Sequence, residues 1–214
     1  MNYGVKSQAW EAGLFSSEIA GIELKSRKGP VTFDKDEHPR AGTTAESLAK
    51  LQPLFKKGGT VSAGNASGIS DGAGAVLVAS ESAVAEHGMT PLARIVSYAV
   101  AGVDPSIMGI GPVPAITSAL AKAGLTLGDM DLIEINEAFA AQALACVKEL
   151  DIDMDKFNLN GGAIAIGHPT GASGSRIMGH LAYELQRTGK QYAIGSACIG
   201  GGQGVAIILE NPNF

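Results

Sequence analysis

Three side chains in the second half of the sequence lie where predicted elements end, and each could take part in catalysis. His168 lies in the glycine-rich stretch AIGHPTGASGS (165–175). Histidine titrates near neutral pH, so this side chain could act as a general base. Cys198 is followed closely by three glycines, whose backbone N–H groups could form an oxyanion hole beside the thiol. Asn136, in INEAF (135–139), could orient a water or hydrogen-bond a ligand.

Each of these residues also has a purely structural interpretation. Asn136 would be an ordinary helix cap if a helix began directly after it, because asparagine is a favoured capping residue. His168 would bond to its own loop backbone, and Cys198 would be a small buried apolar side chain. Cys146 lies inside an apolar helical stretch and is assigned to packing. The remaining histidines are predicted to be structural or solvated: His38, His87 and His180.

The composition limits the class of protein. The 214 residues are 45% hydrophobic and 17% charged, which suffices for a folded core and excludes a disordered or collagen-like chain. The net charge of −5 argues against a nucleic-acid partner, because such binding depends on lysines and arginines that neutralise phosphates. The two cysteines lack metal-ligand spacing, so we expect no metal site and a reducing compartment. Without an apolar run of membrane length or a signal-type start, we expect a soluble intracellular protein with no membrane partner.

The elements that must position these side chains alternate between strand and helix. Residues 1–60 are polar and predicted to be rich in loops, and residues 73–80 are short and apolar, so that helix and strand both remain open. Helices are predicted at 112–123, 137–150 and 173–187, and strands at 131–135, 157–160, 192–198 and 204–210. The last two strands should pair antiparallel. An α/β layered domain with a mixed sheet is therefore predicted for residues 90–214.

Five segments resemble motifs of the thiolase family in the same order. They are NASGISDGAGA (65–75), DPSIMGIGPVPA (104–115), NEAF (136–139), GHP (167–169) and CIGGG (198–202). The resemblance covers residues 60–212, and the forms CIGGGQG and GIGPVPAI are most similar to the mitochondrial-type 3-ketoacyl-CoA thiolases. The resemblance extends only to the C-terminal part of the full-length thiolase sequence.

The resemblance implies a layered α/β fold, in which each half contains a mixed five-stranded sheet with helices on both faces. It divides the chain into a remnant of the CoA-covering loop domain (1–68), the last segment of the N-terminal half (69–89) and the C-terminal domain (90–214). The nucleophilic cysteine of the family belongs to the rest of the N-terminal half. Neither Cys146 nor Cys198 matches it, so we expect the 214 residues by themselves to be inactive.

The resemblance also implies an activity, the cleavage of 3-ketoacyl-CoA by coenzyme A or the reverse condensation. His168 would deprotonate the nucleophile, Cys198 would act as acid or base, Asn136 would hold a water in one oxyanion hole, and the Gly200 N–H would contribute to a second. The substrate-binding positions carried over from the family are Ala63, Ser67, Met108, Ala138 and Phe139.

The same resemblance implies coenzyme A and acyl-CoA as substrates, no separate cofactor and no metal. It also implies a dimer or tetramer of the full-length protein. Its location would be mitochondrial by resemblance and otherwise cytoplasmic. An alternative is a non-catalytic module that binds acyl-CoA or pairs with another subunit.

Overall fold

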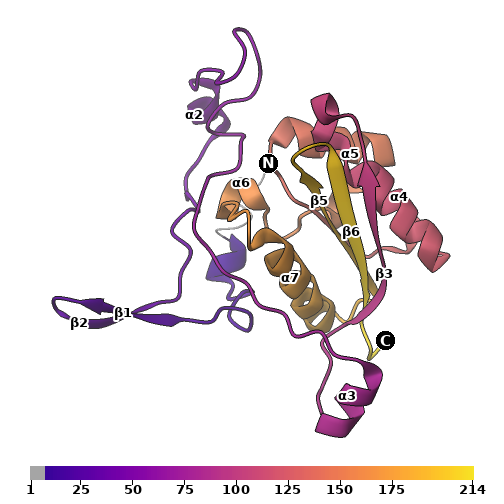
Figure 1. Ribbon diagram of the computed structural model, residues 1–214. Coiled ribbons are helices and arrows are strands. Elements are labelled where there is room, and N and C mark those ends of the chain that lie inside the picture. Colours follow the sequence, from indigo (N-terminus) through magenta and orange to yellow (C-terminus); the bar gives the residue numbers. More distant parts are fainter. Residues whose placement is uncertain (1–7) are drawn as a thin grey trace.

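A computed structural model describes residues 8–214, and its centre is a four-stranded mixed sheet with helices on both faces (Figure 1). The order in the sheet is β3-β6-β5-β4. β4 runs parallel to β5, whereas β6 is antiparallel to both β5 and β3. This confirms the α/β fold class and the antiparallel final pair. The strands are β3 (Arg94–Gly102), β4 (Leu132–Ile135), β5 (Tyr192–Ile199) and β6 (Gln203–Glu210).

The short strand expected at 157–160 is reduced to one parallel bridge between Phe157 and Ile133, so this sheet has four strands within the described residues rather than the five that the resemblance implied. The next residue explains why. Asn158 has a φ of 44°, which takes the backbone out of the extended region. Its side-chain amide, rather than further backbone, pairs with Ile135 of β4. The chain therefore turns away after a single bridge.

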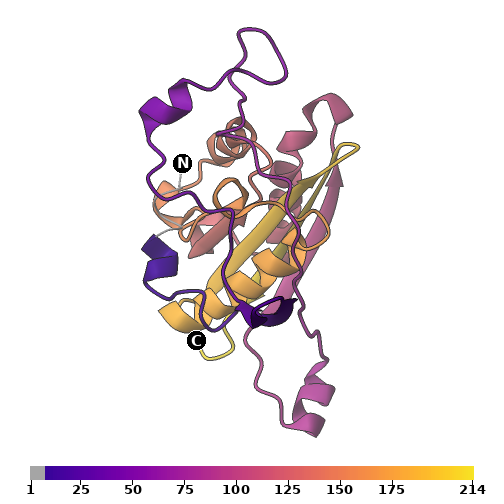
Figure 2. The same ribbon diagram turned by 90° about the vertical axis from the view of Figure 1, so that its left-hand side faces the viewer.

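Two layers of helices bury the two faces of the sheet (Figure 2). α4 (Pro112–Ala123) and α5 (Ala140–Leu150) share one apolar cluster with the sheet, and α7 (Ser173–Thr188) packs on the opposite face. α4 has the predicted limits, since Pro112 suits a first helical turn and Gly124 takes the left-handed conformation that ends a helix. The short helices of this part are η1 (Pro105–Ile110), η2 (Leu127–Asp129), η3 (Met154–Lys156) and α6 (Ala163–Ile166).

α5 begins three residues later than the sequence predicted. Residue Phe139 stays extended, with φ −143° and ψ 146°, and its neighbours pair with residues 65–67. Asn136 therefore does not cap a helix, and its structural interpretation as a cap is wrong.

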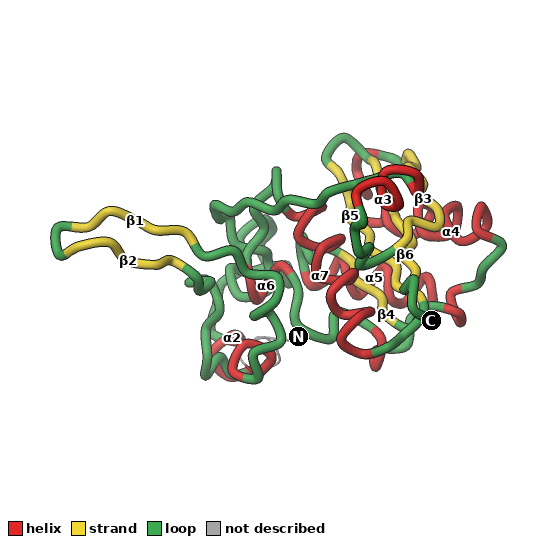
Figure 3. The backbone as a smooth tube through the Cα atoms, turned by 90° about the horizontal axis from the view of Figure 1, so that it is seen from below, coloured by secondary structure: helices red, strands yellow, loops and turns green. Residues whose placement is uncertain are grey.

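The N-terminal part runs along the outside of the sheet domain and has little regular structure. It contains a hairpin of β1 (Ile22–Ser26) and β2 (Gly29–Phe33) and the short helices α2 (Ala45–Ala49) and α3 (Glu81–His87). The hairpin projects away from the rest of the molecule (Figure 3). Residues 73–80 form neither helix nor strand. Across residues 8–214, no helix combines the length and apolarity that crossing a membrane requires.

Candidate active site

Asn136 and His168 meet although 32 residues separate them. Asn136 directly follows β4, and its backbone N–H donates to the Ser196 carbonyl on β5 at 2.8 Å. Its side-chain Nδ2 lies 3.4 Å from His168 Nε2. The Asn136 side chain is buried, and its Oδ1 has no hydrogen-bond partner among the described residues. A buried amide oxygen beside an imidazole can accept a hydrogen bond from a water or ligand that enters the site.

The orientation of the His168 ring is set from its other nitrogen. Nδ1 lies 2.6 Å from the Oγ of Ser173, the first residue of α7, and this hydroxyl donates to the Pro169 carbonyl at 3.2 Å. With the hydroxyl proton directed to the Pro169 carbonyl, Nδ1 is assigned as the donor to Oγ. Nε2 then keeps its lone pair and faces Asn136. This is the tautomer that a general base requires at Nε2.

The surroundings of His168 favour its neutral form. Burial lowers the pKa of His168, and the nearby positive charge of Arg176 lowers it further. The Arg176 guanidinium is itself held in an ion pair with the buried carboxylate of Glu134. A neutral imidazole can accept a proton from a neighbouring acid.

Cys198 lies near the carboxyl end of β5, next to the end of β4 that carries Asn136. Because β4 and β5 are parallel, their carboxyl ends meet at one edge of the sheet. Burial raises the pKa of the Cys198 thiol, so it stays protonated at neutral pH. Cys146 differs: its Sγ donates to the Gly109 carbonyl inside the core, and burial raises its pKa to about 11. This agrees with a packing role for Cys146.

The turn after Cys198 depends on glycine because it lies against the segment before α4. Gly202 has a φ of 88° and accepts a hydrogen bond from the Val103 N–H. A Cβ at Gly204 would lie 1.9 Å from the Gly111 carbonyl oxygen, so no side chain fits there. Gly200, at the start of the turn, is exposed. Its backbone is therefore open to a ligand.

Three of the five predicted binding residues come together in one place. The Ser67 N–H donates to the Ala138 carbonyl at 3.0 Å, and Ala66 forms a bridge with Phe139. The Phe139 ring also contacts the Phe55 ring edge-on, with 5.8 Å between centroids. This strip joins the N-terminal part to the NEAF segment.

The other two predicted binding residues lie in separate elements. Ala63 is exposed and belongs to the turn that precedes the strip. Met108 is half-buried in η1, which packs against α5.

Two family models match the chain, and together they span nearly all of it. "Thiolase, C-terminal domain" matches residues 89–211, which is more than half of the chain, and "Thiolase, N-terminal domain" matches residues 1–82. The chain belongs to the thiolase family. The predicted resemblance is thereby confirmed.

Individual thiolases are similar along the whole chain. A mitochondrial 3-ketoacyl-CoA thiolase from Bos taurus is 63% identical over 214 residues, covering 98% of this chain and 54% of that protein. The crystal structure of human mitochondrial 3-ketoacyl-CoA thiolase superimposes with a TM-score of 0.95 at 62% identity, covering 98% of this chain and 53% of that one. The crystal structure of the same human enzyme in complex with CoA superimposes with a TM-score of 0.94 at 61% sequence identity, covering 98% of this chain and 52% of that one. The chain thus spans about half the length of the thiolases it matches.

Three residues that support this thiolase site were not singled out from the sequence. Ser173 orients His168, while Glu137 and Asn158 form hydrogen bonds around the segment that carries Asn136. Glu137 lies inside the NEAF motif, and that position was a usable signal. Ser173 lies five residues after His168, in the same glycine-rich stretch, and its hydroxyl was not recognised as a partner of the ring. Asn158 acts through a contact across 23 residues of chain, which no local pattern indicates.

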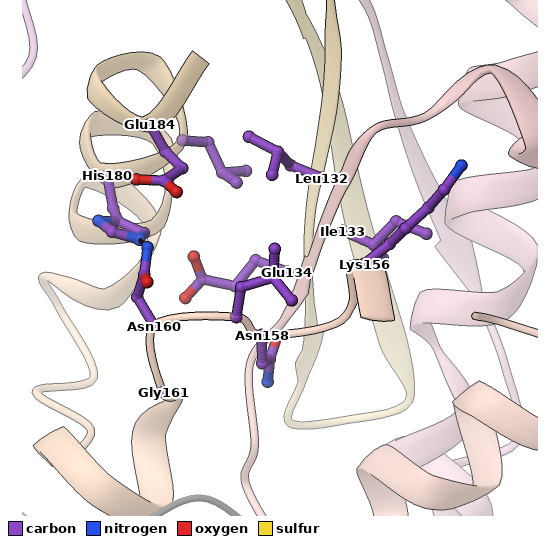
Figure 4. A pocket seen from close by; sticks show the side chains of 11 residues that line it. Leu132, Ile133, Glu134, Lys156, Asn158, Asn160, Gly161, His180 and Glu184 are labelled. Carbon is purple, nitrogen blue, oxygen red and sulfur yellow. Dashed lines mark hydrogen bonds between the residues drawn. The ribbon is translucent and has the colours of Figure 1, made fainter. Parts of the chain in front are cut away.

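A second polar cluster lies between α7 and β4 (Figure 4). His180 hydrogen-bonds the Asn160 side chain and contacts the Glu18 carboxylate at 2.9 Å, and Glu134 and Glu184 lie beside a cavity of about 10 Å³. A space of this size holds at most one water. His180 is thus buried and bonded, in agreement with its structural assignment. Among residues 8–214, no group of three or more His, Cys, Asp or Glu side chains is arranged to hold a metal ion.

Proposed function

We propose that this chain supplies the C-terminal catalytic half of an acyl-CoA acyltransferase that cleaves 3-ketoacyl-CoA with coenzyme A, or catalyses the reverse condensation. The observation that carries the proposal is the contact between Asn136 Nδ2 and His168 Nε2 at the sheet edge where Cys198 also lies. The identity to 3-ketoacyl-CoA thiolases supports the substrate class.

The reaction begins at a cysteine in the part of the family fold that these residues do not span. His168 Nε2 accepts the proton of that thiol, and the thiolate attacks the 3-keto carbon of the substrate. The negative charge develops on the keto oxygen. Breaking the bond between carbons 2 and 3 leaves the acyl group on the cysteine as a thioester and releases the carbanion of acetyl-CoA. Coenzyme A then takes up the acyl group.

Cys198 delivers the proton that the departing carbanion needs. Its raised pKa supports this role, because a thiol that stays protonated at neutral pH can act as an acid. In the condensation direction the Cys198 thiolate removes a proton from acetyl-CoA. The Gly200 N–H and a water held by Asn136 and His168 stabilise the oxyanions, and each such donor contributes up to about 3 to 4 kcal/mol.

Coenzyme A is bound as a substrate along the strip formed by Ser67, Ala138 and Phe139, with Ala63 and Met108 beside it. The CoA complex of the human relative supports this ligand. The domain limits 1–68, 69–89 and 90–214, assembly of the full-length protein as a dimer or tetramer, and a mitochondrial location are part of the same proposal. The location is supported by the names of the relatives.

The test uses a chimaera, in which these 214 residues replace the matching segment of the human mitochondrial 3-ketoacyl-CoA thiolase. We expect the chimaera to cleave acetoacetyl-CoA or longer 3-ketoacyl-CoA, and the 214 residues alone to show no turnover. His168→Ala and Cys198→Ala should each abolish the activity of the chimaera. A folded chimaera that binds coenzyme A in calorimetry without turnover would instead favour a non-catalytic binding module.

A further inference from the structure

A buried amide takes the place of a sheet partner at the end of β4. Asn158 Oδ1 accepts the Ile135 N–H at 3.0 Å, and its Nδ2 donates to the Ile135 carbonyl at 3.1 Å. The Asn158 backbone N–H also donates to the Ile133 carbonyl at 2.9 Å. These bonds fix the last residues of the strand immediately before Asn136.

The carboxylate of Glu137 continues this network to a second segment. One oxygen accepts a hydrogen bond from Asn158 Nδ2 and the other from the Ile164 backbone N–H, each at 3.1 Å. Ile164 lies in α6, whose C-cap, Gly167, directly precedes His168. Glu137 therefore joins the strand end that carries Asn136 to the short helix that leads to His168.

The site has no spare room around this carboxylate. Glu137 is 2% exposed and Asn158 is 3% exposed. A Cβ built at Gly162 would lie 2.5 Å from the carboxyl carbon of Glu137. Burial raises the pKa of Glu137, and the hydrogen bonds from Asn158 and Ile164 oppose that rise. Both oxygens act as acceptors, so a glutamine could satisfy only one of the two N–H donors.

We infer that Glu137, held by Asn158, is a positioning residue that sets the distance between the Asn136 amide and the His168 imidazole. This inference rests on the proposed function, because the spacing of the two groups matters only if they share an oxyanion. Its effect should fall on the chemical step rather than on substrate binding.

The first variant is Glu137→Gln in the chimaera. A small displacement of a catalytic group costs up to about 100-fold in rate, so we expect kcat to fall about 10- to 100-fold. KM for the ketoacyl-CoA should change by less than about threefold, since binding of the ground state is kept. The acidic limb of the pH profile should move to higher pH, because a displaced His168 gains water and its lowered pKa returns toward the ordinary value.

A second variant reaches the same carboxylate without removing a hydrogen-bonding group. Gly162→Ala pushes a methyl group against Glu137 and should reproduce the loss of kcat. It decides the question if Glu137→Gln does not fold. The matched control is Glu184→Gln, a carboxylate on α7 that is 4% exposed and paired with Arg187. Its kcat per folded molecule should stay within about twofold of the starting protein.

The inference is overturned if Glu137→Gln or Gly162→Ala keeps the kcat and the acidic limb of the chimaera, or if Glu184→Gln loses kcat to the same extent. If the chimaera itself shows no turnover, the proposed function fails. Nitrogen-15 NMR of His168 then tests the positioning role of Glu137 independently of turnover. We expect Glu137→Gln to raise the pKa of His168 and shift its Nε2 resonance. Unchanged values would refute the positioning role.

Discussion

The Ser173 hydroxyl lies 2.6 Å from Nδ1 of His168, on the side of the ring opposite to Asn136. The imidazole is thus held between the first turn of α7 and the end of β4. One contact fixes the tautomer and the other marks where the reacting oxygen should lie. The position of the His168 ring therefore depends on two elements that lie apart in the sequence, β4 and α7.

Replacing Ser173 by alanine should reduce turnover without unfolding the chimaera. His168 Nδ1–H then loses its acceptor, so the ring can rotate away from Asn136. We expect kcat to fall about tenfold, in line with the cost of a misplaced catalytic group. Steady-state kinetics with acetoacetyl-CoA measures this loss. The control is Ser175→Ala, which removes a hydroxyl that donates to the Ala172 carbonyl, and equal losses in both variants would count against the role of Ser173.

The activity should persist to lower pH than an ordinary histidine base allows. Burial lowers the pKa of His168 by disfavouring the imidazolium, and the Arg176 charge acts in the same direction. The neutral base is therefore present below the ordinary histidine pKa of about 6.5. We expect the acidic limb of kcat/KM in the chimaera to have its midpoint below that value. A midpoint clearly above it is incompatible with this environment of His168.

The two thiols should differ in reactivity, and both should react slowly at neutral pH. Burial raises the pKa of Cys198 and raises that of Cys146 to about 11, while only the thiolate is nucleophilic. Cys198 is half-buried and Cys146 is fully buried. Iodoacetamide should label Cys198 first, at a rate that rises with pH, as peptide mass spectrometry can measure. Faster labelling of Cys146 would contradict the packing assignment.

The glycine turn should tolerate no side chain at Gly204. A Cβ there would lie 1.9 Å from the Gly111 carbonyl oxygen, so the turn must move away from the segment before α4. Overpacking of this kind costs about 1 to 3 kcal/mol in the free energy of unfolding. Urea unfolding of Gly204→Ala measures that loss. Gly102→Ala is the matched control, because nothing lies within 4 Å of its added Cβ; a comparable loss there would show that the contact with Gly111 is not the cause.

Much of the C-terminal domain could be predicted from local sequence. The limits of α4 follow from Pro112 and Gly124, and the final strand pair follows from two β-rich runs joined by glycines. β3 was missed, because RIVSYAVAG mixes polar and small residues without clear alternation. The expected strand at 157–160 was wrong for a reason outside its own composition, since the Asn158 amide replaces backbone pairing.

The residues of the candidate site likewise fall into those that the sequence indicated and those that it did not. Asn136, His168 and Cys198 were singled out because reactive types stand among glycines at the ends of elements. Glu137 and Asn158 were not, because their importance comes from hydrogen bonds across 27 and 23 residues of chain. Ser173 was not either, because its contact with His168 depends on how the intervening loop folds. The candidate reacting groups can thus be found by residue type, whereas the residues that hold them require the folded arrangement.

The most direct measurement is a crystal structure of the chimaera bound to acetyl-CoA. We predict that the thioester oxygen lies within hydrogen-bonding distance, about 3 Å, of a water held by Asn136 and of His168 Nε2, which donates once it carries the proton of the nucleophilic cysteine. The Cys198 thiol should face the acetyl methyl group from the other side. A thioester bound away from these three residues, with the pantetheine off the strip of Ser67 and Phe139, would contradict the account.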